Sequence, residues 1–169
     1  MDIALKLLLD PADVAAFRRL ALIKRHAADK PCAEQLSRVY FDTPGLHLRK
    51  RGVDLHLRGT GFSWIEILQA DQDAVAGLHC RRKCEAPIEG PQPDLRALAA
   101  RIEQDCAWAK ALTAPAMERC LVPIFGCDVR RTVWLLLLPH RADIELRLDI
   151  GELRRGYIHE PICAVELEL

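Results

Sequence analysis

Charged side chains recur at every second position in several short segments of this 169-residue chain. They alternate with aliphatic residues in 53–58 and 143–149, and they share one face in 79–85. Successive side chains of a strand point to opposite faces, so each segment predicts a strand with one charged face. Arginine and lysine there would bind phosphate oxygens, and carboxylates would hold a divalent cation. Such a set suits phosphoryl transfer, which depends mainly on positioning and charge neutralisation.

The first ten residues, MDIALKLLLD, show the same alternation at the start of the chain. Asp2, Ala4 and Lys6 share one face of the predicted strand. The other face carries Ile3, Leu5 and Leu7, which we expect to pack against helices.

The remaining elements follow from capping, turn and periodicity signals. Asp10 and Pro11 begin a predicted helix over 10–28 with an apolar stripe. A second helix is expected over 95–110 and a short one within 114–121. The other predicted strands lie at 36–45, 53–58, 62–69, 78–88, 122–138, 142–151, 152–158 and 162–169.

A half-buried open sheet would explain the alternation of any single strand. Charged faces, however, recur on strands from both ends of the chain, and the few amphipathic helices need an apolar sheet surface to cover. Both observations favour an α+β fold in which a closed antiparallel eight-stranded β-barrel forms a tunnel with a polar interior. The amphipathic helices would pack outside, and residues 1–169 would form a single domain.

The overall composition limits the classes of partner. Lys plus Arg and Asp plus Glu both number 24, so a chain-wide basic field for nucleic acid is absent. The seven cysteines form no Cys-x-x-Cys pair, and the start of the chain lacks the pattern of a signal peptide. The most apolar run, 133–139, is too short to span a bilayer. We expect a cytoplasmic protein without a membrane partner.

Four segments carry a resemblance to a known family. YFDTPGLHLRKRGVDLHLR, GLHCRRKCEAPIEGPQPDL, IELRLDIGEL and EPICAVELEL resemble the CYTH domain, the triphosphate tunnel metalloenzyme fold. The sequences of these segments are most similar to the bacterial inorganic triphosphatase branch. The resemblance implies a tunnel in which acids hold Mg²⁺ or Mn²⁺, bases cradle a triphosphate, and water attacks a terminal phosphorus. In that branch a helical CHAD domain often follows, and no such domain is expected within these residues.

Matching the family's motifs to this sequence gives a set of candidate residues. The resemblance implies catalytic roles for Lys6 and Glu85. The implied triphosphate-binding residues are Lys6, Arg58, Arg81, Arg130 and Arg131, and the implied metal ligands are Asp2, Glu145, Glu166 and Glu168. Neighbours on a strand face opposite ways, so only one of Arg130 and Arg131 can point inward. Arg130, which shares a face with Asp128 and Thr132, is preferred.

Five positions depart from the family's pattern. Ala4 and Ala164 stand where acids are expected, His56 and Gln69 replace basic residues, and Lys83 replaces a glutamate. Losing one group that stabilises transition-state charge typically costs about 10²–10³ in rate. A reduced activity is therefore expected.

Two kinds of function stay open from the sequence. The first is a metal-dependent triphosphatase that hydrolyses inorganic triphosphate. The alternative is a catalytically inactive domain that binds polyphosphate or a nucleoside triphosphate as a sensor or scaffold. An adenylate cyclase of class IV or a thiamine triphosphatase is more distant, because the fold alone does not fix the substrate. A monomer or a homodimer is expected.

Overall fold

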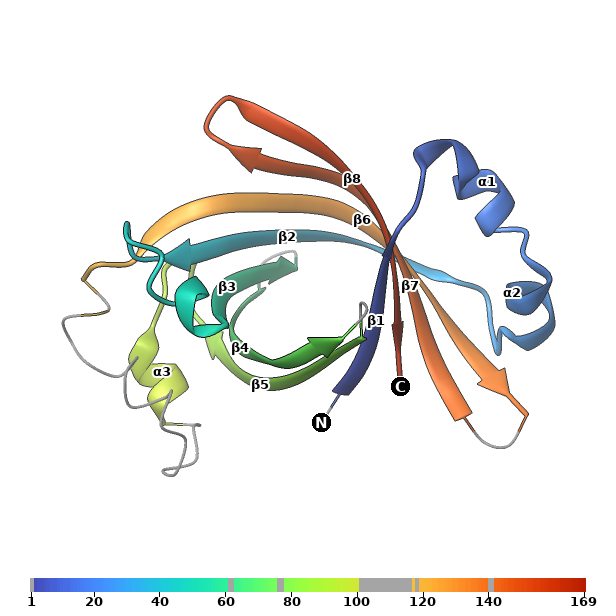
Figure 1. Ribbon diagram of the computed structural model, residues 1–169, viewed down its shortest axis with the longest axis horizontal. Coiled ribbons are helices and arrows are strands. Elements are labelled where there is room, and N and C mark those ends of the chain that lie inside the picture. The colour runs from blue at the N-terminus through green and yellow to red at the C-terminus, as the bar shows by residue number, and fades with distance from the viewer. Residues whose placement is uncertain (1, 61–62, 76–77, 101–116, 118, 140–141) are drawn as a thin grey trace.

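The computed structural model describes residues 2–60, 63–75, 78–100, 117, 119–139 and 142–169. Eight strands lie in this part of the chain, together with short helices (Figure 1). The strands are β1 (Asp2–Leu8), β2 (Cys32–Asp42), β3 (Val53–Thr60), β4 (Ser63–Val75), β5 (Leu78–Ile88), β6 (Val122–Leu138), β7 (Ala142–Arg155) and β8 (Ile158–Glu168).

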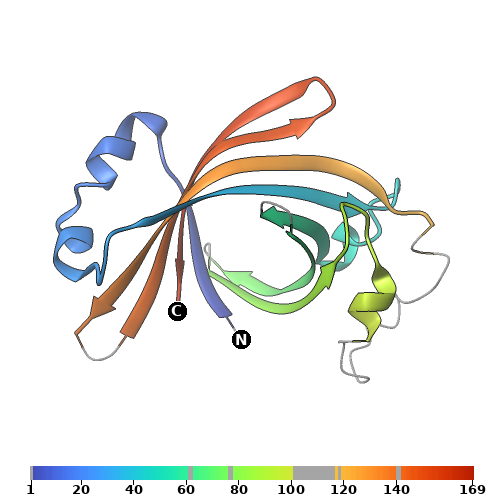
Figure 2. The ribbon, with the colours of Figure 1, turned by 180° about the vertical axis from the view of Figure 1, so that it is seen from behind.

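The strands pair antiparallel in the order β1-β5-β4-β3-β2-β6-β7-β8, which confirms the predicted eight-stranded antiparallel sheet. The first strand also pairs with the last, since Ala4 lies opposite Glu168 and Lys6 opposite Glu166. The order therefore returns to its start as a closed barrel. Both views show the two chain ends side by side where β1 and β8 meet (Figures 1 and 2).

The predicted long helix over 10–28 is instead a series of short ones. A 3₁₀ turn, η1 (Pro11–Asp13), precedes α1 (Val14–Phe17), and α2 (Ala21–His26) follows. The backbone of Leu20 is extended, with φ −52° and ψ 137°, which ends one helix and begins the next. Both short helices contact the outer face of the sheet, where Phe17 meets the Trp134 ring edge-on.

Later elements also differ from the sequence expectation. Helix α3 covers Leu95–Ala99, and most of the predicted helices over 95–110 and 114–121 lies outside the described residues. The predicted strands 142–151 and 152–158 join into the single strand β7, which continues through Gly151. A further 3₁₀ turn, η2 (Arg49–Arg51), leads into β3.

The outer face of the sheet is apolar where helices cover it. One cluster, which includes Leu55, Leu57 and Leu68, packs with Leu95 and Leu98 at α3. The other places Ile23 of α2 among Trp134, Leu136, Leu146, Leu148, Cys163 and Val165. Burial of these faces leaves the alternating side chains of the same strands directed to the barrel interior.

One packing prediction for β1 is wrong. Leu7 was expected to pack under helices, but half of its surface is exposed (50%). The helices α1 and α2 lie against β6 rather than β1, and the nearby residue that joins their cluster is Leu9. The inward placement of Ala4 and Lys6 is as expected, because both line the interior cavity.

Gly151 permits a close approach of β7 to β6. It pairs with Val129, and a Cβ atom there would lie 2.0 Å from the carbonyl oxygen of Asp128 and 2.7 Å from Cα of Val129. Both obstacles are backbone atoms, which cannot rotate away.

We therefore expect Gly151→Ala to lower the free energy of unfolding by about 3 kcal/mol or more, because a methyl group overpacks this crossing. Gly126→Ala on the neighbouring strand is the matched control, since its nearest non-local atom would lie 3.6 Å away. Urea unfolding of the two variants checks this, and equal midpoints would contradict it.

Candidate functional site

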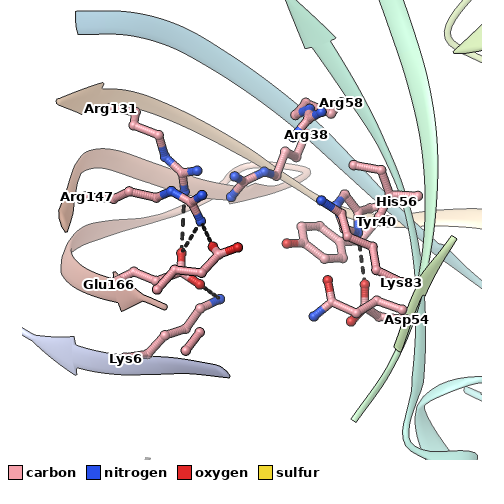
Figure 3. Close-up of a pocket in the computed structure, with 14 residues that line it drawn as sticks. Lys6, Arg38, Tyr40, Asp54, His56, Arg58, Lys83, Arg131, Arg147 and Glu166 are labelled. Atoms are coloured by element: carbon pink, nitrogen blue, oxygen red, sulfur yellow. Dashed lines mark hydrogen bonds and ion pairs between the residues drawn. The ribbon is translucent and has the colours of Figure 1, made fainter. Parts of the chain in front are cut away.

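The barrel interior contains a cavity of about 230 Å³ to which all eight strands contribute side chains (Figure 3). Among the described residues that line it, six are basic, three are acidic and one is histidine. The lining consists of Ala4, Lys6, Arg38, Tyr40, Asp54, His56, Arg58, Ile67, Gln69, Lys83, Arg131, Arg147, Glu166 and Glu168. The cavity surface is therefore predominantly cationic.

Glu166 is the centre of one wall of the cavity. Strand register sets Arg147 of β7 and Lys6 of β1 on its two sides. Its carboxylate lies 3.6 Å from Lys6 Nζ, 3.7 Å from a terminal nitrogen of Arg131 and 3.8 Å from one of Arg147 (Figure 3). One carboxylate thus draws three cations together.

Further acids hold the same arginines from the sides. Asp149 accepts two hydrogen bonds from Arg131, at 2.8 and 2.7 Å, in the bidentate geometry that fixes a guanidinium plane. Burial works against the charged form of Arg131, but Asp149 outweighs it and raises the arginine pKa. Arg147 Nε donates to Glu145 at 2.5 Å, and the same guanidinium donates to Glu168. These pairs keep both arginines at the cavity wall.

The facing wall comes from β2, β3 and β5. Lys83 Nζ lies 2.5 Å from Glu85, and a terminal nitrogen of Arg58 lies 3.7 Å from the same carboxylate oxygen. Arg38 extends toward the middle of the cavity (Figure 3). Within the described part of the chain, no carboxylate forms an ion pair with Arg38. Its guanidinium is thus available to an anion.

His56 lies in this wall as a neutral ring. Burial lowers its pKa, the hydrogen bond and charge of Asp54 oppose that effect, and Arg38 and Arg58 lower the pKa further. Nδ1 lies 2.8 Å from Asp54, so the neutral ring donates there and leaves Nε2 as an acceptor. The ring also lies against Tyr40, with centroids 4.8 Å apart and ring planes tilted by 30°.

The structure reverses the preference between two adjacent arginines. Arg131 lines the cavity and is 7% exposed, whereas Arg130 is exposed on the opposite face of β6. That outer face continues through Thr132 and Trp134, which are buried beside α1 and α2. The helices therefore fix which face of β6 points inward.

The other predicted residues divide into three groups. Lys6, Arg58, Glu166 and Glu168 line the cavity, as do the departing positions Ala4, His56, Gln69 and Lys83. Glu85 and Glu145 contact lining residues, while Ala164 lies two residues before Glu166 on the same face of β8, opposite Asp149. The side chains of Asp2 and Arg81 lie outside the described part of the structure.

Sequence reasoning missed five lining residues as site candidates, the apolar Ile67 and four polar ones. Asp54 and Arg147 stood on faces that the alternation identified as charged, so that signal was present. Arg38 and Tyr40 lie in a strand whose two faces are both mixed, and alternation alone does not single them out.

The described acids of the cavity wall do not form the metal site that the resemblance implies. Across the described residues, no three His, Cys, Asp or Glu side chains gather into a group that could hold a metal. Three of the four predicted ligands, Glu145, Glu166 and Glu168, instead contact Arg147. This arrangement, as it stands, does not fit a divalent cation.

A wider cavity of about 850 Å³ adjoins the interior one. Tyr40 and Asp54 line both, and the Tyr40 ring stacks on Phe125 with centroids 4.4 Å apart. Arg49 and Arg155 also line the wider cavity.

No helix in the described residues has the length and apolar character needed to cross a membrane.

The neutral state of His56 predicts a pH dependence of stability. Its pKa in the folded protein lies below the ordinary 6.5, so the unfolded chain takes up this proton at a higher pH. The contribution of neutral His56 to the free energy of unfolding is complete above pH 6.5 and is lost as the pH falls through the pKa of the folded protein. His56→Gln should therefore reduce the loss of unfolding free energy between about pH 7.5 and 5. Urea unfolding at the two pH values checks this, and an equal loss in the variant and the wild type would contradict it.

Comparison with known proteins gives the chain a family. The profile of the CYTH domain matches residues 2–169. An inorganic triphosphatase of Haemophilus influenzae is 30% identical over 138 residues, which cover 79% of this chain and 36% of that protein. The chain thus spans about a third of that relative's length.

Solved structures support the same fold. A putative adenylyl cyclase from Hippeastrum, described as having a dominant triphosphatase activity, superposes with a TM-score of 0.61 at 16% identity, covering 100% of this chain and 80% of that one. A putative adenylate cyclase from Bacillus halodurans gives 0.58 at 16% identity, with the same coverage of 100% and 80%. Because the profile match covers nearly every residue and the barrel agrees with these structures, the chain belongs to the CYTH domain family.

Proposed function

We propose that the barrel interior is a tunnel that binds inorganic triphosphate and hydrolyses its terminal phosphate. The observation that carries this proposal is the excess of basic over acidic side chains on the cavity surface. A closed, partly desolvated lumen strengthens charge-assisted hydrogen bonds to phosphate oxygens. The inorganic triphosphatase among the relatives supports the choice of ligand.

The proposed ligand would lie between the two walls. Arg38 and Arg58 would donate to its oxygens from one side, and Lys6 and Arg131 from the other. Asp149 and Glu166 contact Arg131 and hold it in place before the ligand arrives. Such preorganisation avoids part of the entropy cost of binding.

Hydrolysis requires a water to attack the terminal phosphorus and the pyrophosphate to leave. Lys6 would neutralise charge that develops on the phosphoryl oxygens. Glu85 would orient the water, once the ligand draws Lys83 and Arg58 away from it. Arg81 is proposed as a further phosphate-binding residue from its place on β5, and the exposed Arg130 is not. The resemblance also implies Mg²⁺ or Mn²⁺, but the contacts of Glu145, Glu166 and Glu168 with Arg147 do not fit such an ion, and the proposed reaction does not depend on it.

Binding without hydrolysis is the second candidate, and the ion pairs favour it. The acids that would serve a metal-assisted reaction are occupied by lysine and arginine. A nucleoside triphosphate is a further possible ligand for this second candidate, since the stacked Tyr40 and Phe125 border the wider cavity beside the proposed phosphate site. The protein would then act as a sensor or scaffold for such anions.

Arg58→Ala should weaken tripolyphosphate binding by about ten- to a hundredfold, the size expected for a lost hydrogen bond to a charged group. Arg130→Ala is the matched control, because this arginine is exposed on the outside of the barrel and should leave the affinity unchanged. Isothermal titration calorimetry measures both. An absence of binding by the wild type would overturn the proposal.

Phosphate release from tripolyphosphate separates the two candidates. The wild type should release phosphate faster than the Glu166→Ala, Glu168→Ala double variant, assayed with Mg²⁺, with Mn²⁺ and with a chelator. Binding by calorimetry together with a rate equal to the double variant's would favour the sensor.

A further inference from the structure

We infer that Arg147 is a built-in cation that takes the place of a divalent metal among Glu145, Glu166 and Glu168. The triphosphate site would then bind its ligand without a metal ion at this wall. This inference deepens the proposed function and rests on it for the identity of the ligand, although the metal part of it can be tested alone.

The position of Arg147 is the first argument. On β7 and β8, Glu145 pairs with Glu168 and Arg147 pairs with Glu166, so three carboxylates surround one guanidinium. The contacts are 2.5 Å to Glu145, 3.8 Å to Glu166 and a hydrogen bond to Glu168. Those three acids are the same ones that the family's pattern nominates for the metal. The guanidinium thus occupies the space that a bound metal ion would need.

The neighbouring strand supplies an independent argument. Across from Glu168 on β1 lies Ala4, which is buried and offers no oxygen ligand. Mg²⁺ and Mn²⁺ sites rely on carboxylate and water oxygens in a defined geometry. One side of the proposed metal position therefore lacks a donor, and the other side is filled by a cation.

Charge and burial oppose displacement of the arginine. The side chains of Arg147 and Glu166 are only 18% and 13% exposed, so repulsion between a divalent ion and the guanidinium would be weakly screened. Lys6 and Arg131 also lie beside Glu166 and would add to the repulsion. Arginine remains charged at every physiological pH, so a metal gains no access by deprotonating it.

Arg147 also remains useful to an anionic ligand. It lines the cavity, and a guanidinium has five N–H donors in a planar fork that matches phosphate oxygens. A divalent metal ion would also supply positive charge but could be removed by a chelator, whereas Arg147 cannot. Triphosphate affinity is therefore expected to be insensitive to chelation.

In the first experiment the full chain is titrated with Mn²⁺ alone. Binding is measured by calorimetry and from the electron paramagnetic resonance signal of the free ion. The wild type should show no saturable binding below about millimolar Mn²⁺. Arg147→Ala should free the three carboxylates and bind Mn²⁺ at least tenfold more tightly than the wild type. Adding Glu168→Gln to Arg147→Ala should abolish the gain.

Arg154→Ala is the matched control. This arginine lies on the same strand and also contacts two acids, Asp128 and Glu152, but it does not line the cavity. Its removal should leave Mn²⁺ binding at the wild-type level. Circular dichroism checks that each variant is folded, and Arg147→Gln serves as a second variant if the alanine variant is not.

Two results would overturn the inference. One is tight Mn²⁺ binding by the wild type that is lost in Glu168→Gln. This result would show that the acids bind a metal while Arg147 is present. The other is a folded Arg147 variant that binds Mn²⁺ no better than the wild type.

Tripolyphosphate titrations with and without a chelator separate this inference from the proposed function. Equal affinities, within about twofold, support it. Binding that requires Mg²⁺ or Mn²⁺ overturns the role of Arg147 but keeps the triphosphate site. If tripolyphosphate binds under neither condition, the proposed function fails, while the Mn²⁺ titration still decides whether Arg147 stands in for a metal.

Discussion

The pairing of β1 with both β5 and β8 determines where the charged side chains of the barrel point. It brings the two ends of the chain together, so that Lys6 lies opposite Glu166 and Ala4 opposite Glu168. A shift of one residue in this register would turn the lysine outward and place leucines in the cavity. In the other strands the apolar clusters under the helices oppose a shift of this kind, because each strand would have to expose its buried face.

Closing the sheet buries several positively charged side chains, and ion pairs offset the cost of that burial. Arginines inside a barrel lose water, and a buried cation without a partner is costly. Asp149 holds Arg131 by two hydrogen bonds, and Glu166 brings Lys6, Arg131 and Arg147 into one network. These acids stabilise cations that would otherwise repel one another. They also leave Arg38, which lacks such a pair in the described part of the chain, directed at the middle of the cavity.

Alternation along the strands was enough to predict the sheet and much of its inner face. The order Asp54, His56, Arg58 placed three lining residues correctly, because their neighbours Val53, Leu55 and Leu57 are buried on the outside. Alternation could not choose between Arg130 and Arg131, since the choice depends on where α1 and α2 pack. It also could not reveal that Arg147 contacts three acids. That result depends on the register between β7 and β8, which joins residues about twenty positions apart.

The departures that the sequence comparison predicts from the family's pattern add up to a more positive lumen. By that comparison Ala4 and Ala164 replace acids on the inner faces of β1 and β8, and Lys83 replaces an acid on β5. In the same comparison His56 and Gln69 replace bases, but His56 keeps a neutral ring near Arg38 and Arg58, where a third positive charge would be repelled. The balance moves toward positive charge in a lumen that already contains Arg147. A lumen with fewer carboxylates and more fixed cations would bind a polyanion by its own side chains, as proposed above, with correspondingly less need of a mobile metal ion.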